Sequence, residues 1–135
     1  MPCEGRKCFR REYYALIDEE RIAVLKTVIR TTGGSVPVVA STNAGATREV
    51  VSYCQEAEQL SATGVLLAAP CCSLSTEDEL FEHFRVVAES IGIPIMLYNY
   101  PGRTGVDMVP DLIVRLAKLD NIQYVKESSG DTSSR

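Results

Sequence analysis

Four short, almost continuously apolar segments recur along the 135-residue chain, separated by stretches with helical spacing. They begin at about residues 36, 64, 94 and 122, so successive segments are about 28 to 30 residues apart. Apolar strands that alternate with amphipathic helices are typical of a parallel sheet covered by helices. The interval is close to the roughly 30 residues per unit of an eight-unit barrel of ~250 residues. The sequence therefore predicts an α/β fold of about four βα units.

Signals for the ends of helices support this division. Thr76 and Glu79 form a capping box that opens one helix, and Pro110 suits the first turn of another. The first helix would begin with Asp18 as its N-cap and end at Gly33, where a left-handed cap costs little. In chain order, we expect a helix over 18–33, a strand over 36–41, a helix over 47–60, a strand over 64–70, a helix over 76–91, a strand over 94–99, a helix over 110–118 and a strand over 122–126.

Composition and charge exclude several classes of function. With 45% hydrophobic and 24% charged residues, the chain has the composition of a globular domain. Its formal net charge of -4 gives no basic field, so we expect no nucleic-acid partner. The apolar stretches are far too short to cross a bilayer, so we expect no membrane partner and a cytoplasmic location. Five cysteines and one histidine without a Cys-x-x-Cys pair argue against a metal site and favour reduced thiols.

Two reactive side chains end neighbouring expected strands. Tyr98 and Lys126 both lie four residues after their strand starts, so the alternation along a strand places them on the same face. Ala40 and Ala68 hold the same offset in the two earlier strands and would leave room beside them. A lysine amine can attack a carbonyl and a phenol can transfer protons. The pair therefore suits imine chemistry in a pocket at the carboxyl ends of the strands.

Two plainer interpretations remain open from the residues alone. No strand is followed by a G-x-G-x-x-G or a Walker loop, yet an open, flavodoxin-like sheet without a nucleotide motif fits the same pattern. Lys126 would then be a solvated strand-end lysine paired with Glu127 or Asp131, and Tyr98 a core aromatic with a satisfied hydroxyl. The alternative to an enzyme is a noncatalytic α/β scaffold.

Two motifs give the chain a specific family resemblance. The segments LYNYPGRTGVD (97–107) and VKESSGD (125–131) resemble the signature of the dihydrodipicolinate synthase and N-acetylneuraminate lyase family. Supporting matches begin at Glu12, so the resemblance covers nearly the whole chain and corresponds to the middle of a dihydrodipicolinate synthase-like protein. It implies one partial (β/α)8-barrel (TIM-barrel) domain over 1–135, about four βα units of a parallel barrel, with 1–11 as a poorly matched N-terminal end.

The resemblance also implies roles for three residues. Lys126 would form a Schiff base with the ketone of pyruvate or a related 2-oxo acid, Tyr98 would relay protons, and Arg103 would bind a carboxylate through its planar fork. The arginine in the loop over 101–105 is a feature in which this chain is more similar to dihydrodipicolinate synthases than to sialic-acid lyases. We therefore expect a lyase that condenses pyruvate with aspartate semialdehyde. The alternatives are a sugar 2-oxo acid aldolase or dehydratase of the same family, or a noncatalytic barrel fragment.

No cofactor is expected, because the imine itself withdraws electrons from the reacting carbon. The resemblance implies a small-molecule 2-oxo acid as substrate and a homo-oligomer if the full barrel forms. Two departures limit it: the hydroxyl-rich turn before Glu12 is absent, and Cys71-Cys72 stands where a second relay tyrosine is usual. With about half of the units of a barrel, the 135-residue chain alone should be poorly active and associate through open strand edges.

Overall fold

The computed structural model describes residues 15–71 and 73–130. In this part, four parallel strands form one sheet in chain order, and each strand pairs with the next. The elements are α1 (Asp18–Thr32), β1 (Val39–Ser41), α2 (Thr47–Gln59), β2 (Gly64–Ala68), α3 (Glu77–Ser90), β3 (Ile95–Asn99), α4 (Pro101–Thr104), α5 (Pro110–Leu116) and β4 (Ile122–Glu127). The predicted parallel α/β fold is confirmed. Expectations for residues 1–14, Cys72 and Asp131 fall outside the described residues.

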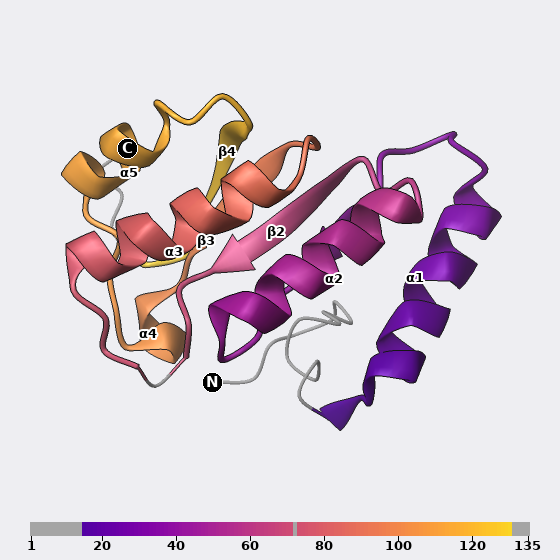
Figure 1. The fold of residues 1–135 in the computed structure, drawn as a ribbon, viewed down its shortest axis with the longest axis horizontal. Helices are drawn as coiled ribbons and strands as arrows, with labels where there is room; N and C mark the ends of the chain where they lie inside the picture. Colours follow the sequence, from indigo (N-terminus) through magenta and orange to yellow (C-terminus); the bar gives the residue numbers. More distant parts are fainter. Residues whose placement is uncertain (1–14, 72, 131–135) are drawn as a thin grey trace.

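The hydrophobic core lies between one face of the sheet and helices α2, α3 and α5. Figure 1 shows α2 and α3 side by side across β2. On the covered face, Val65, Leu67, Ile95 and Leu97 have no exposed surface. Burying a side chain of this kind contributes about 1.5–3 kcal/mol, so this face supplies much of the stability. The helix predicted over 76–91 is present as α3, and four apolar residues of α3 and its C-cap are buried: Leu80, Phe84, Val87 and Ile91.

Local capping signals set the ends of the helices. Both arms of the predicted capping box are present, since Glu79 N donates to Thr76 Oγ1 at 3.3 Å and Thr76 N donates to Glu79 Oε2 at 2.8 Å. Pro110 is the first residue of α5, as predicted. At the end of α1, Gly33 has a φ of +52° and its N–H reaches Ile29 O, which is the expected left-handed cap.

The start of α1 differs from the prediction. Its N-cap is Ile17, whose backbone is extended, and Asp18 is already the first helical residue. Ile17 N donates to Glu20 Oε2 at 3.1 Å, so one arm of a capping box replaces the expected aspartate cap. Asp18 still stabilises the helix end, because a carboxylate in the first turn interacts favourably with the helix dipole.

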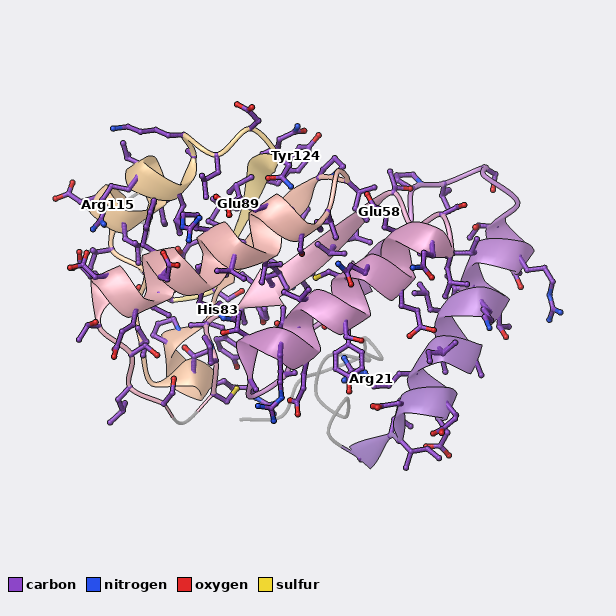
Figure 2. The ribbon with its side chains drawn as sticks, in the orientation of Figure 1. Arg21, Glu58, His83, Glu89, Arg115 and Tyr124 are labelled. Atoms are coloured by element: carbon purple, nitrogen blue, oxygen red, sulfur yellow. The ribbon has the colours of Figure 1, made fainter. Side chains whose placement is uncertain are left out.

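Helix α1 lies beside α2, at the end of the molecule away from β4, and is weakly buried (Figure 1). It has no buried residue, and its apolar Val28 is 40% exposed. Its main anchor is Arg21, whose guanidinium carbon lies 3.9 Å from the ring centroid of Tyr53 and whose Nη2 donates to Asn43 O at 3.2 Å. Figure 2 shows Arg21 between α1 and α2. The apolar spacing predicted the helix correctly, but little in the described residues covers its face.

Strand β1 is shorter than expected, and its register places Ala40 at a different level of the sheet from the one predicted. Its ladder begins at Val39 rather than Val36, which follows from Pro37, a residue without an N–H to donate. Ala40 therefore pairs with Val65 and is buried on the helix-covered face. The expectation that Ala40 lies level with Ala68 is wrong. Asn43 stands there instead, and its Oδ1 accepts a hydrogen bond from Ala68 N at 2.7 Å.

Cys54 on α2 is a buried, free thiol. Its Sγ donates to Thr42 Oγ1 at 3.2 Å, and burial raises its pKa to about 11. Cys71 is exposed at the end of the segment after β2, and the predicted reduced thiol is confirmed for Cys54. Cys54 therefore acts as a small apolar residue of the core.

His83 lies where α3 packs against α2. Its side chain is 7% exposed, its Nδ1 is 2.9 Å from Thr47 Oγ1, and its Nε2 has no hydrogen-bond partner. Figure 2 labels the ring on α3 beside α2. Burial disfavours the imidazolium form and lowers the pKa of His83 below 6.5. His83 is therefore a packing residue between α3 and α2.

We expect acidification to destabilise the fold through His83. In the unfolded chain the imidazole gains a proton near its ordinary pKa, whereas in the folded chain it does so only at lower pH. The free energy of unfolding is therefore lost as pH falls below about 6.5 toward the folded pKa. Urea unfolding of the wild type and His83→Gln at about pH 7.5 and about pH 5.5 checks this. The wild type should lose more stability on acidification than the variant, and equal losses would exclude the mechanism.

Candidate active site

The carboxyl ends of three neighbouring strands bring together Ala68, Tyr98 and Lys126. Ala68 pairs with Tyr98, and Tyr98 pairs with Lys126, so the three side chains share the face opposite the helix-covered core. Lys126 Nζ lies 4.6 Å from the centroid of the Tyr98 ring. Both side chains are half-buried. The predicted common face of Tyr98 and Lys126 is confirmed, and a cation in this position is attracted to the ring face.

Glu127 points to the other side of β4 and does not pair with Lys126. Its carboxylate accepts hydrogen bonds from Asn99 Nδ2 at 3.0 Å and from Ser129 N at 2.6 Å. Partial burial raises the pKa of Glu127, but the hydrogen bonds from Asn99, Ser129 and Ser128 outweigh it, so the pKa lies below its usual value. Among the described residues, no ion pair joins Lys126 to Glu127. This removes one of the two partners considered for a solvated lysine, and the other, Asp131, lies outside the described residues.

Arg103 lies in α4, the single helical turn that directly follows β3. Its side chain is exposed, and no described contact joins it to Lys126 or Tyr98. The turn is closed by Gly105, whose φ of +75° favours glycine, and by Thr104 Oγ1, which donates to the backbone O of Val106 at 2.9 Å. The structure therefore places Arg103 at the same edge of the sheet as the pair but does not bring its guanidinium against them.

Two residues that the sequence did not single out belong to this edge. The ring of Tyr100 lies 5.6 Å from the ring of Tyr98, centroid to centroid, and lines the start of α4. Asn99 is only 2% exposed and forms hydrogen bonds with Asp107, Glu127 and Met108. The sequence signal that could have indicated Asn99 is a polar amide at the end of an apolar strand, because a buried amide must find hydrogen-bond partners.

A cavity of about 510 Å³ opens on the same side of the sheet as Lys126. Most of its lining is apolar and comes from α1, β1 and the open face of the sheet, including Leu66 and Met96. Its volume is in the range of small-molecule pockets. Within residues 15–71 and 73–130, no group of three or more His, Cys, Asp or Glu side chains could hold a metal ion. Lys126 lines this cavity, and Tyr98 lies beside Lys126 on the same face of the sheet.

The fold and the site together define a class: a parallel α/β protein with reactive groups at the carboxyl ends of its strands. The sequence pattern of the Dihydrodipicolinate synthetase family matches residues 11–135. The chain belongs to this family, which confirms the resemblance carried by the motifs at 97–107 and 125–131.

Relatives with known names agree with this assignment. The chain is 42% identical over 116 residues to a 4-hydroxy-tetrahydrodipicolinate synthase from Oceanobacillus iheyensis, covering 86% of the chain and 39% of that protein. It is 45% identical over 113 residues to the protein of the same name from Saccharophagus degradans, covering 84% and 39%. A crystal structure of a chloride-inhibited dihydrodipicolinate synthase from Acinetobacter baumannii with pyruvate has a TM-score of 0.89 and 38% identity, covering 91% of this chain and 42% of that chain.

These matches identify the sheet as part of a (β/α)8 barrel. The chain spans about two fifths of the length of the relatives, and its fold matches that of the Acinetobacter baumannii structure with a TM-score of 0.89. The open flavodoxin-like sheet is thereby set aside. No helix in the described part of the chain is long and apolar enough to cross a membrane. A cytoplasmic location and a single domain over 1–135 stay predictions.

Proposed function

We propose that this chain carries the imine-forming part of a lyase site that acts on pyruvate or a related 2-oxo acid. The reaction would be that of a 4-hydroxy-tetrahydrodipicolinate synthase, with aspartate semialdehyde as second substrate. The proposal depends above all on one observation, the position of Lys126 Nζ 4.6 Å from the Tyr98 ring centroid at the carboxyl edge of the sheet. Family membership and the pyruvate bound in the Acinetobacter baumannii relative support it.

Lys126 supplies the nucleophile in this proposal. Its neutral amine attacks the ketone carbon of pyruvate, and the resulting carbinolamine loses water to give a protonated imine. The imine draws electrons from the neighbouring methyl carbon, which loses a proton to give an enamine. The enamine carbon then attacks the aldehyde carbon of the second substrate and forms the new carbon–carbon bond. The imine serves as the electron sink, so no metal or organic cofactor is required.

Tyr98 and Arg103 take the supporting roles. The Tyr98 phenol would accept and return protons during imine formation and carbon–carbon bond formation, a contribution typical of general acid–base catalysis. Arg103 would bind a substrate carboxylate, because an exposed guanidinium at the mouth of the site can form a bidentate contact. This role favours aspartate semialdehyde over a sugar aldehyde as the second substrate. The homo-oligomer expected for a full barrel stays a prediction.

A chimera tests the proposal directly. Residues from 11 onward replace the matching segment of the Oceanobacillus iheyensis relative, which supplies the parts of the barrel outside the match. The chimera is treated with labelled pyruvate and borohydride, which reduces the imine to a stable amine, and the label is mapped by mass spectrometry. We expect labelling at Lys126, and much slower labelling of the isolated 135-residue chain. A folded chimera without label at Lys126 would support the noncatalytic barrel instead.

A further inference from the structure

We propose that Asn99 is a positioning residue for Lys126: its side-chain amide ties the end of β4 to the end of β3 and thereby holds the lysine against Tyr98. The inference rests on the proposed function, because it concerns the same lysine. It adds a residue that does not touch the reacting atoms but sets where they lie.

The side chain of Asn99 uses nearly all of its hydrogen-bonding capacity. Nδ2 donates to Asp107 Oδ1 at 2.7 Å and to Glu127 Oε2 at 3.0 Å, and Oδ1 accepts from Met108 N at 3.0 Å. Its backbone O also accepts from Ser128 N at 2.9 Å. A primary amide has two N–H donors, so both are satisfied here. The buried amide of Asn99 thus joins β3, the loop after α4 and the end of β4 in one hydrogen-bonded cluster.

The register of β3 and β4 explains why this cluster acts on Lys126. The pairing shifts between Ile95 and Met96, so the amino half of the ladder does not fix the carboxyl half. Asn99 pairs with Glu127, the position next to the Tyr98–Lys126 pair. A slip by one residue would turn Lys126 to the other face of the sheet. The amide–carboxylate bond therefore fixes the register where the lysine needs it.

In the isolated 135-residue chain, the position of β4 in the sheet makes local fixing more important. In the described part of the chain, β3 is its single neighbour in the sheet. Two of its residues, Tyr124 and Val125, are 54% and 45% exposed, so packing holds the strand weakly. Without the amide, the carboxylates of Asp107 and Glu127 would also lose a shared donor and repel each other. Loss of Asn99 should therefore loosen the end of β4 more than the rest of the fold.

Nuclear magnetic resonance of the 135-residue chain tests the inference without requiring a reaction. The ring current of Tyr98 should displace the ε-methylene signals of Lys126 upfield, because the ammonium lies over the ring. In Asn99→Ala, we expect more than half of this displacement to disappear. The matched control is Asn121→Ala, at the opposite end of β4, where Nδ2 donates to Ala88 O at 2.9 Å and Ile91 O at 3.0 Å. This variant should keep the displacement.

A second pair of variants covers the case in which Asn99→Ala does not fold. Glu127 is only partly buried, and Glu127→Ala removes one partner of the amide while keeping Asn99. Glu127→Ala should lose the displacement, and Glu127→Gln should keep it, because the glutamine carbonyl still accepts the hydrogen bond. A folded Asn99→Ala or Glu127→Ala with an unchanged Lys126 signal overturns the inference, as does an equal loss in Asn121→Ala.

Trapping in the chimera separates this result from the proposed function. There, Asn99→Ala should slow labelling of Lys126 by about tenfold or more, since small misplacements of reacting groups are costly. If the unsubstituted chimera is not labelled at all, the proposed function fails, while the displacement of the Lys126 signal still decides the role of Asn99. If labelling occurs and Asn99→Ala leaves its rate unchanged, the positioning role is wrong and the function stands.

Discussion

Lys126→Arg should abolish the labelling of the chimera by pyruvate and borohydride. The substitution keeps a positive charge near the Tyr98 ring, so it changes the local electrostatics and packing little. A guanidinium does not lose its proton in proteins and therefore provides no neutral amine to attack the ketone. We expect labelling at the level of a reaction without pyruvate, measured by mass spectrometry of the digested protein.

Lys118→Arg is the matched control for this substitution. Lys118 is exposed, follows α5 and lies at the amino end of β4, away from the carboxyl edge. The control should label at Lys126 as fast as the unsubstituted chimera. If Lys126→Arg retained labelling, the imine would form at another amine, and the assignment of Lys126 as the nucleophile would be wrong.

The sequence predicted the fold well where short-range signals set the elements. Thr76 and Glu79 marked the start of α3, Pro110 marked the start of α5, and the apolar runs marked the strands within a few residues. These signals act within three or four residues, so they can be read without knowledge of the tertiary structure. The exception was β1, where the apolar run continued across Pro37 and hid the true start of the ladder at Val39.

Helix α4 and the face of α1 show two limits of such patterns. A segment with Pro101, Gly102 and Gly105 was interpreted as a loop, yet its first four residues form one helical turn that ends at a left-handed glycine. Helical spacing predicted a helix over 18–33, but the burial of α1 depends on which elements lie opposite it. Val28 remains 40% exposed because neighbouring elements in the described residues do not cover it.

The candidate site also has a part that the sequence predicted and a part that it did not. The common face of Tyr98 and Lys126 followed from the period of two along a strand, and the register confirms it. The cluster around Asn99 joins residues 8 and 28 positions apart, so no local pattern could reveal it. The position of the Arg103 guanidinium depends on a turn that the sequence did not predict. The sequence thus located the reactive pair, whereas the residues that hold the pair in place are joined by long-range contacts that the sequence did not reveal.

Phe84→Ala should reduce the free energy of unfolding by about 3–5 kcal/mol, the usual cost of removing a buried phenylalanine. The ring has no exposed surface and lies in the core between the sheet and α3. A well-packed interior relaxes only partly around the vacated volume, so the loss of buried apolar surface and the cavity both contribute. Proteins have only about 0.05–0.15 kcal/mol of stability per residue, so this loss is a large share of the total. A large fraction of the Phe84→Ala molecules should therefore unfold at moderate urea concentrations.

Phe81→Ala, on the same helix, separates core burial from the loss of an aromatic ring as such. Phe81 is half-buried, and the guanidinium carbon of Arg115 lies 4.8 Å from its ring centroid. Its removal should cost only about 1–2 kcal/mol, because less apolar surface leaves water contact and one exposed cation–π contact is lost. Urea unfolding followed by circular dichroism measures both variants. Equal losses for Phe81→Ala and Phe84→Ala would mean that the core is not organised around the face of α3 that carries Phe84.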